Sequence, residues 1–248
     1  MERIPAGRPC LPVQMEKRSP NGAFTKVLKS WLQECDRHIG CEPDPKRGLQ
    51  LPKRLIDVKL PKKPKLVEPG PDDDPKGMRY IALSHKWGDP KKIPVTNGQN
   101  LEARKNVIEE QLPQSFQDAI WMTHKLDCDY LWIDSLCIQQ DMFDDEADTM
   151  QSIFSNAYCV LAAASAEGAS VGFLHRRKET EAIKMGAVFI SEITNDFERD
   201  VLRSPLNTRG WVLQERALAR RTIFFTDHQV YFECGDGVRC ETLLKLRK

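Results

Sequence analysis

The sequence predicts an α/β fold in which a parallel sheet carries helices on both faces. Between residues 80 and 164, three short apolar runs alternate with two stretches of helical periodicity. Runs of this length, rich in β-branched and aromatic residues, are typical of strands buried on both faces, and such strands are usually parallel. The order strand, helix, strand, helix, strand is that of a doubly wound sheet.

The chain before this core has three parts. Residues 1–22 are rich in proline and charge, and we expect a flexible leader. Apolar residues recur with helical spacing from Phe24 to Cys35, which predicts an amphipathic helix with Trp31 on its buried face. Leu51–Leu60 is expected to contain a short strand, and the proline- and aspartate-rich stretch Lys62–Gly77 an exposed loop without core residues.

The predicted core places strands at Tyr80–Ser84, 130–134 and Cys159–Ala164. Its helices are expected at 113–126 and 144–157, and the mixed segment 99–111 is also compatible with a helix.

Beyond Gly172 the apolar pattern weakens. One strand is expected at Ala187–Ile190, a helix at Trp211–Ala219, and a hairpin from Arg221–Phe225 and Gln229–Phe232. We therefore expect a single domain over residues 23–248. Its core spans residues 78–174, with an N-terminal helix and a C-terminal helix–hairpin (205–240) packed on it.

Composition excludes several classes of function. The chain has 37 basic and 36 acidic residues, so charge gives no reason to expect nucleic acid or an anionic membrane as a partner. No apolar run approaches the roughly 18 residues of a membrane span, and the N-terminus lacks the apolar stretch of a secretory signal. The eight cysteines are then expected as thiols in a reducing compartment, and we expect a cytoplasmic protein.

Polar residues at the ends of the predicted strands are the candidate binding site. Ser84, His85 and Trp87 follow the first strand, and Asp134 and Gln140 follow the second. Carboxyl ends of parallel strands meet at one edge of a sheet, where open α/β sheets bind ligands. The ordinary alternative is that the acid caps a turn and the tryptophan fills the core.

Glu146 is the candidate catalytic carboxylate, at the start of the helix predicted after the second strand. Its alternative role is to complement the helix dipole. The chain has no glycine-rich phosphate loop and no Gly-x-Ser-x-Gly elbow, which argues against a common hydrolase or nucleotide-binding site.

Cys35, His38 and Cys41 have the spacing C-x2-H-x2-C at the end of the first predicted helix. Tetrahedral zinc takes four ligands, and no fourth lies nearby in the sequence. Cys10, Cys234 or Cys240 would contribute only through folding. We expect no bound metal, with the three residues closing the helix end against the core.

Taken together, these segments resemble the fungal heterokaryon-incompatibility (HET) domain family. The matching pieces stand in family order: Trp31, Cys35, His38 and Cys41, LPKRLIDV (51–58), YIALSHKWG (80–88), LPQSFQDAI (112–120), YLWIDSLCIQQD (130–141), EADTMQSIFSNAYCVLAAAS (146–165), PLNTRGWVLQERALARR (205–221) and VYFEC (230–234). Two features depart from the family: Ser-Tyr-x-Trp-Gly is commoner than the sequence at 84–88, and the loop 141–145 is shorter than usual.

The resemblance implies an intracellular effector that triggers regulated cell death when unlike fungal cells fuse. It also implies a distant similarity to Toll/interleukin-receptor (TIR) domains, which have a flavodoxin-like parallel sheet. Some TIR domains cleave NAD with a glutamate in the helix after a central strand, and Glu146 best fits that place.

Two functions follow as expectations. The first is a death-inducing domain that acts through self-association or protein partners and requires no cofactor. The alternative is an NAD glycohydrolase in which Glu146 stabilises positive charge on the ribose, with Ser84, His85, Trp87, Asp134 and Gln140 binding NAD.

Overall fold

The structure is a computed structural model of the 248-residue chain. It describes residues 22–43, 50–105, 109–143, 146, 149–174, 182–185, 188–191, 196–210, 212–241 and 245–246. Apart from Gly22, the expected leader lies outside the described residues, and so does Trp211.

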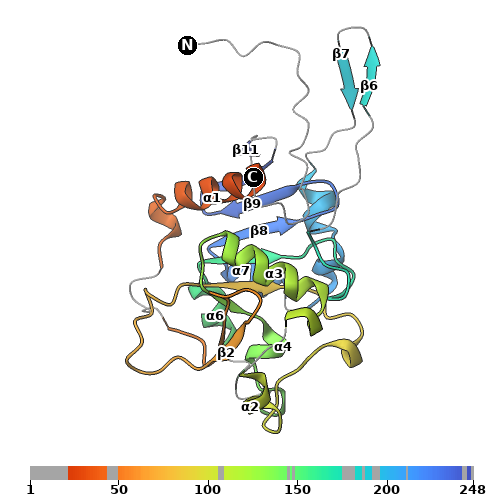
Figure 1. Cartoon of the computed structure of the whole chain (residues 1–248). Helices are drawn as coiled ribbons and strands as arrows, with labels where there is room; N and C mark the ends of the chain where they lie inside the picture. Colours follow the sequence, from red (N-terminus) through yellow and green to blue (C-terminus); the bar gives the residue numbers. More distant parts are fainter. Residues whose placement is uncertain are drawn as a thin grey trace.

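The fold is mixed α/β and is built around one large sheet (Figure 1). Within the described residues this sheet has nine strands in the order β11-β10-β9-β8-β5-β3-β4-β1-β2. The strands are β1 (Leu55–Asp57), β2 (Lys65–Val67), β3 (Tyr80–Ser84), β4 (Tyr130–Trp132), β5 (Cys159–Ala162), β8 (Arg221–Phe225), β9 (Val230–Cys234), β10 (Gly237–Cys240) and β11 (Lys245–Leu246).

The parallel centre predicted from the three apolar runs is confirmed. Ile81 of β3 is paired with Leu131 of β4 on one side and with Cys159 of β5 on the other, and both pairings are parallel. All residues of these strands are buried, as expected for strands covered on both faces.

The sheet is wider than predicted because the C-terminal hairpin belongs to it. Strand β8 pairs in parallel with β5, and β9 pairs antiparallel with β8. An isolated three-strand sheet would leave the backbone groups of β5 unpaired along one edge, and β8 satisfies them. The hairpin therefore extends the sheet instead of packing on it as a separate layer.

The opposite end of the sheet also differs from expectation. The strand expected at Leu51–Leu60 is only Leu55–Asp57, which runs antiparallel to β4. The segment Lys62–Gly77 is not entirely an exposed loop: β2 pairs with β1, and Leu66 is buried. The prolines and aspartates around β2 hide the apolar pattern of this three-residue strand in the sequence. Among the described strands, β2 forms one edge of the sheet.

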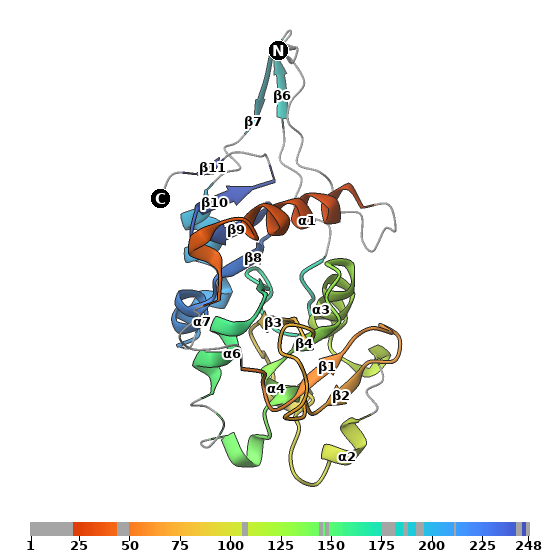
Figure 2. The ribbon, with the colours of Figure 1, turned by 90° about the vertical axis from the view of Figure 1, so that its left-hand side faces the viewer.

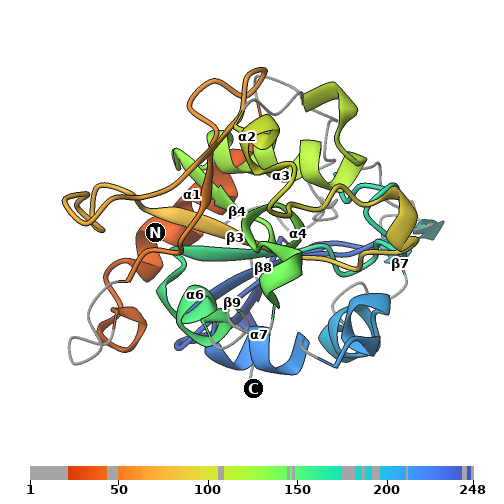
Figure 3. The ribbon, with the colours of Figure 1, turned by 90° about the horizontal axis from the view of Figure 1, so that it is seen from below.

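Helices cover both faces of the sheet (Figure 3). The helices α1 (Ala23–Cys35) and α3 (Gln114–Lys125) lie on one face, and α6 (Met150–Asn156) and α7 (Val212–Leu218) on the other. Phe24 of α1 contacts Phe225 of β8, and the ring of Phe154 in α6 meets Trp132 of β4. Among the helices that the structure describes, none combines the length and apolar character needed to cross a bilayer.

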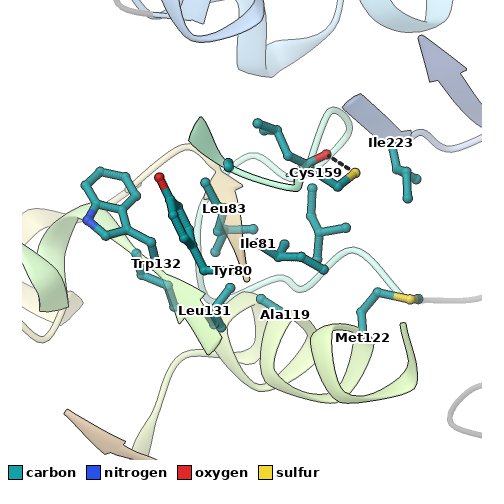
Figure 4. Close-up of a cluster of buried hydrophobic side chains, with 14 of the residues drawn as sticks. Tyr80, Ile81, Leu83, Ala119, Met122, Leu131, Trp132, Cys159 and Ile223 are labelled. Atoms are coloured by element: carbon teal, nitrogen blue, oxygen red, sulfur yellow. Dashed lines mark hydrogen bonds between the residues drawn. The ribbon is translucent and has the colours of Figure 1, made fainter. Parts of the chain in front are cut away.

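The core beneath α3 is shown in Figure 4. Alternate residues of each strand reach opposite faces, so Ile81 and Leu83 face the side of α3, which carries Ala119 and Met122. Tyr80 instead points to α6 and donates its hydroxyl to the carbonyl of Ile153 (2.6 Å). This alternation decides on which face each polar residue at the end of β3 lies.

The segment expected to hold one strand at Ala187–Ile190 forms a separate antiparallel pair. Its strands are β6 (Ala182–Met185) and β7 (Val188–Ser191). Figure 1 shows this pair projecting from the body of the molecule.

Candidate functional site

Polar residues from β3, β4 and the C-terminal segment meet at the carboxyl edge of the parallel strands. Ser84 ends β3, and Asp134 begins the short helix α4 (Asp134–Cys137), two residues after β4. Residues 205–210 and 212–215, which include the 3-10 helix Pro205–Thr208 and the start of α7, cross this edge. They bring Arg209 and Glu215 to the strand ends.

These side chains form a continuous set of contacts, which we call the edge cluster: Ser84, Trp87, Asp134, Arg209 and Glu215. Trp87 Nε1 donates to Asp134 Oδ2 (2.8 Å), and Ser84 Oγ donates to Glu215 Oε2 (2.5 Å). The guanidinium of Arg209 lies between the two acids, 3.6 Å from Asp134 Oδ2 and 3.7 Å from Glu215 Oε1. One cation is thus shared by two buried carboxylates.

Glu215 carries a carboxylate that is buried within the edge cluster. Burial raises the pKa of Glu215, against the opposing effects of Arg209 and of the Ser84 hydroxyl. Arg209 and the Ser84 hydroxyl therefore stabilise the ionised form of Glu215, which burial disfavours.

His85 lies on the α3 side of the sheet, with its Nδ1 4.0 Å from Asp134 Oδ1 of the edge cluster. Its ring meets Phe116 of α3 edge-on, with centroids 5.0 Å apart, while Arg209 donates to its main-chain carbonyl. Burial lowers the pKa of His85 to about 4. Because consecutive strand-end residues face opposite sides, Ser84 and His85 do not form a nucleophile–base pair.

Gln140 borders this region without entering the edge cluster. Its side-chain amide donates to the carbonyl of Ile138 (3.2 Å) and weakly to that of Asp134 (3.5 Å). Its main-chain N–H donates to the carbonyl of Thr96 (2.8 Å). These bonds hold the loop that follows α4.

Glu146 lies apart from the edge cluster, in a buried ion pair. Only 5% of its surface is exposed, and Arg54 Nη2 donates to both of its carboxylate oxygens (2.6 and 2.5 Å). The N–H of Gln139 also donates to it (3.2 Å), and Lys53 Nζ lies 3.5 Å away. Arg54 donates further to the carbonyl of Cys137 (2.8 Å), so the pair joins β1 to the loop after α4.

Two open pockets lie elsewhere on the molecule. One, of about 360 Å³, lies where β3 and β8 begin and is lined by Tyr80, Tyr158 and Arg221 among others. The other, of about 460 Å³, lies between α7 and the end of β9 and includes Leu213 and Cys234. Neither is lined by Glu146 or by a residue of the edge cluster.

The cysteine–histidine motif gains a fourth member by folding. The side chains of Cys35, His38, Cys41 and Cys234 converge, and their candidate ligand atoms lie within 4.8 Å of one another. The sequence could not select Cys234 over Cys10 or Cys240, because the hairpin's place in the sheet decides which cysteine reaches the end of α1.

Sequence reasoning did not select Arg54, Arg209 or Glu215 as site residues. Arg54 had one usable signal, a cation directly before an apolar strand. Glu215 had another, an acid within a short helix that carries buried residues. Neither signal names a partner, since Ser84 and Glu215 are 131 residues apart and Arg54 and Glu146 are 92 apart.

Comparison with known proteins gives one match. The sequence model of the family described as heterokaryon incompatibility protein (HET) matches residues 80–215, which is more than half of the chain. The chain belongs to the HET family. The matched region runs from β3 to Glu215 and so contains the whole edge cluster and Glu146. Neither the curated proteins nor the solved structures contain a match to this HET chain.

Proposed function

We propose that this chain is a cytoplasmic effector domain of vegetative incompatibility, which triggers regulated cell death through self-association or contact with a protein partner. Membership of the HET family supports the role in heterokaryon incompatibility. The burial of Glu146 in an ion pair with Arg54 supports action through protein contacts rather than through catalysis. The seven described cysteines are free thiols, which agrees with a reducing compartment.

The buried carboxylate of Glu146 is not accessible to a substrate. A carboxylate that stabilises an oxocarbenium centre must face the sugar in a cleft. The Glu146 carboxylate is instead buried and receives hydrogen bonds from Arg54 and from the main chain of Gln139. A substrate would have to displace Arg54, and breaking a buried ion pair costs about 3–5 kcal/mol. This favours the interaction module over the enzyme.

An exposed apolar residue offers a place for partner contact. Leu213 on α7 is 76% exposed and lines the pocket of about 460 Å³ beside the end of β9. Ile39, also strongly exposed, neighbours Gly40 of the same pocket. Contiguous exposed apolar patches mark protein-binding surfaces, and Leu213 and Ile39 lie at or beside this one pocket.

The proposed distant similarity to TIR domains has support from strand order. The parallel strands β4, β3, β5 and β8 lie in the order second, first, third, fourth along the chain. This is the beginning of the flavodoxin-like order 2-1-3-4-5. The proposal therefore extends to a flavodoxin-like origin of the parallel centre.

NAD cleavage is the second candidate function. The observation that favours it is the gathering of Ser84, Trp87 and Asp134 at the carboxyl edge of parallel strands, where ligands bind in open α/β sheets. In this alternative NAD is the substrate, bound there with help from His85 and Gln140, and Glu146 supplies the catalytic carboxylate after release from Arg54.

One pair of assays separates the two functions. Purified protein is incubated with NAD and free nicotinamide is measured, while expression in fungal cells measures killing. The informative variant is Arg54→Met/Glu146→Leu, which removes both charges and avoids leaving one buried alone. Glu167→Gln, at an exposed glutamate, is the matched control. We expect no nicotinamide, and killing by wild type, variant and control.

The opposite result in these assays would favour the enzyme. Nicotinamide release by the wild type, lost together with killing in a double variant that still unfolds cooperatively, would establish the enzyme. Partner contact is tested by Leu213→Asp, which should reduce killing and leave the melting temperature unchanged. Leu60→Asp, at an exposed leucine outside the pocket, should not reduce killing.

A further inference from the structure

Three cysteines and a histidine converge where the first helix meets the last part of the sheet. Cys35 is the last residue of α1, and His38 and Cys41 lie in the turn that follows it. Cys234 ends β9, 196 residues from His38. The three thiols are buried, and the histidine is half-buried.

The spacing of the four ligand atoms is close to that of a tetrahedral metal site. His38 Nδ1 lies 3.9 Å from Cys41 Sγ and 3.7 Å from Cys234 Sγ. Zinc bonds of about 2.3 Å to sulfur and about 2.0–2.1 Å to nitrogen imply ligand separations of roughly 3.5–3.8 Å in a tetrahedron. All ligand atoms lie within 4.8 Å of one another, so small side-chain rotations complete the geometry.

We propose that Cys35, His38, Cys41 and Cys234 bind one structural zinc ion. Four protein ligands fill the tetrahedron and leave no open position for water or substrate, which distinguishes a structural site from a catalytic one. Three thiolates and one imidazole are ligands that suit zinc, whereas Ca²⁺ and Mg²⁺ require oxygen.

The backbone is shaped for this site. The N–H of His38 donates to the carbonyl of Cys35 (3.0 Å), and the N–H of Cys41 to the carbonyl of His38 (3.0 Å), so the turn directs side chains three residues apart inward. Gly235 permits the close approach of the hairpin. A Cβ at that position would lie 3.3 Å from Cys41 Sγ and 3.4 Å from the carbonyl oxygen of Gly40.

The surrounding side chains orient and neutralise the site. With Nδ1 directed at the thiols, His38 Nε2 faces Asp236 Oδ2 at 3.9 Å, the carboxylate–histidine arrangement common behind zinc ligands. Arg220 Nη1 donates to the carbonyl of Cys41 (3.1 Å), and the buried Arg221 lies beside Cys35. Zinc with three thiolates carries one net negative charge, which these arginines offset.

A zinc ion at this site would link the first described helix to the C-terminal strands. The site joins α1 to the hairpin β9–β10, and Figure 2 shows α1 lying along these strands. A metal that binds only the folded chain stabilises it by the free energy of binding.

Metal analysis tests the proposal on the full-length chain. Protein produced with zinc in the medium and dialysed under reducing conditions should contain about one zinc per chain. Cys234→Ser should lose most of it, and so should His38→Ala. His38→Cys should retain zinc through four thiolates, a rescue that general loss of packing would not give. Cys240→Ala, at a buried cysteine of the neighbouring strand, is the matched control and should bind like the wild type.

Two further measurements keep the result independent of variant stability. Replacement of zinc by Co²⁺ in the wild type should give the strong visible absorption of a tetrahedral thiolate site, and a chelator should lower its melting temperature. Cooperatively folded wild-type protein that contains no zinc and gives no Co²⁺ spectrum overturns the proposal. Recovery of six thiols instead of all eight from the chain, denatured without reductant, also overturns it, because it would indicate a disulfide.

Discussion

At the scale of single residues, the buried carboxylates of Glu146, Asp134 and Glu215 each have a cationic partner. Glu146 has Arg54, and the acids of the edge cluster share Arg209. The carboxylate of Glu146, expected to complement a helix dipole or to face a cleft, is held by the guanidinium of Arg54, which directly precedes the distant strand β1. Substitutions at this scale should change the free energy of unfolding and its dependence on pH.

The first prediction concerns the buried pair Arg54–Glu146. Arg54→Met and Glu146→Gln should each lower the free energy of unfolding by about 3–5 kcal/mol, because each leaves one buried charge without its partner. The double variant Arg54→Met/Glu146→Leu should lose much less than the sum. Urea denaturation of all three gives the coupling energy. A loss below about 1 kcal/mol in Glu146→Gln would be the value of a helix-dipole contact and would contradict a buried pair.

The second prediction concerns pH and His85. The unfolded histidine binds a proton near pH 6.5, whereas the buried ring does so only near pH 4. Between these values the unfolded state binds more protons, so stability should fall by about 3 kcal/mol as the pH is lowered through this window. His85→Phe should flatten the melting temperature from pH 6.5 to 4, and the exposed His124→Gln should not.

Glu215 changes the stability with pH in the direction opposite to that of His85. Its raised pKa in the folded state gives stability that is present below the unfolded pKa near 4.5 and is lost as the pH rises through the folded value. Glu215→Gln should therefore steepen the loss of stability on acidification. An acid slope that Glu215→Gln and His85→Phe shift in the same direction would contradict these assignments.

The sequence predicts part of the candidate site and leaves out the rest for a physical reason. Ser84, Trp87 and Asp134 follow apolar runs, and strand ends in a parallel sheet meet at one edge. Arg209 and Glu215 reach this edge from a later part of the chain, and Arg54 meets Glu146 apart from it. Hydrophobic periodicity describes which face of an element is buried, but it carries no information about which distant side chain neutralises a charge.

At the scale of elements, amphipathic patterns were reliable where the element packs by one face. The apolar spacing of α1 places Trp31 against Phe232 of β9, with ring centroids 5.9 Å apart. The segments missed or misplaced were those decided by backbone pairing. The three-residue β2 has too few side chains for a pattern, and the parallel pairing of β8 with β5 depends on a free strand edge.

The third prediction concerns the attachment of α1 to the sheet. Trp31 is 3% exposed, and replacing a buried tryptophan by alanine removes its contacts and leaves a cavity. Trp31→Ala should lower the free energy of unfolding by about 3–5 kcal/mol, measured by denaturant titration. Trp121→Ala, at a partly exposed tryptophan of α3, is the control and should cost clearly less. Equal costs would mean that α1 does not depend on this contact.

At the scale of the whole molecule, the fourth prediction tests whether the C-terminal segment is needed by the rest. A chain ending at Leu174 lacks β8 and β9, so β5 loses one of its two parallel partners and α1 loses Phe225 and Phe232. We expect this fragment to bind a hydrophobic dye and to melt without a cooperative transition.

The control for this truncation removes a similar kind of element without touching the large sheet. Replacing residues 182–191 by a short glycine–serine linker deletes β6 and β7, which pair with each other. That variant should keep the cooperative melt of the full chain. A fragment ending at Leu174 that melts as sharply, and at the same temperature, as the full chain would show that its core folds alone.

The contacts between α1 and the last hairpin also determine when α1 can complete its packing during synthesis. Glu34 is paired with Arg239, 205 residues later. At a synthesis rate of about 5–20 residues per second, roughly 10–40 s separate the appearance of α1 from that of its partner strand. During this interval the apolar face of α1 has no strand to cover it. We therefore expect the yield of native protein to depend on translation speed and on chaperones that shield this first helix until the last strands emerge.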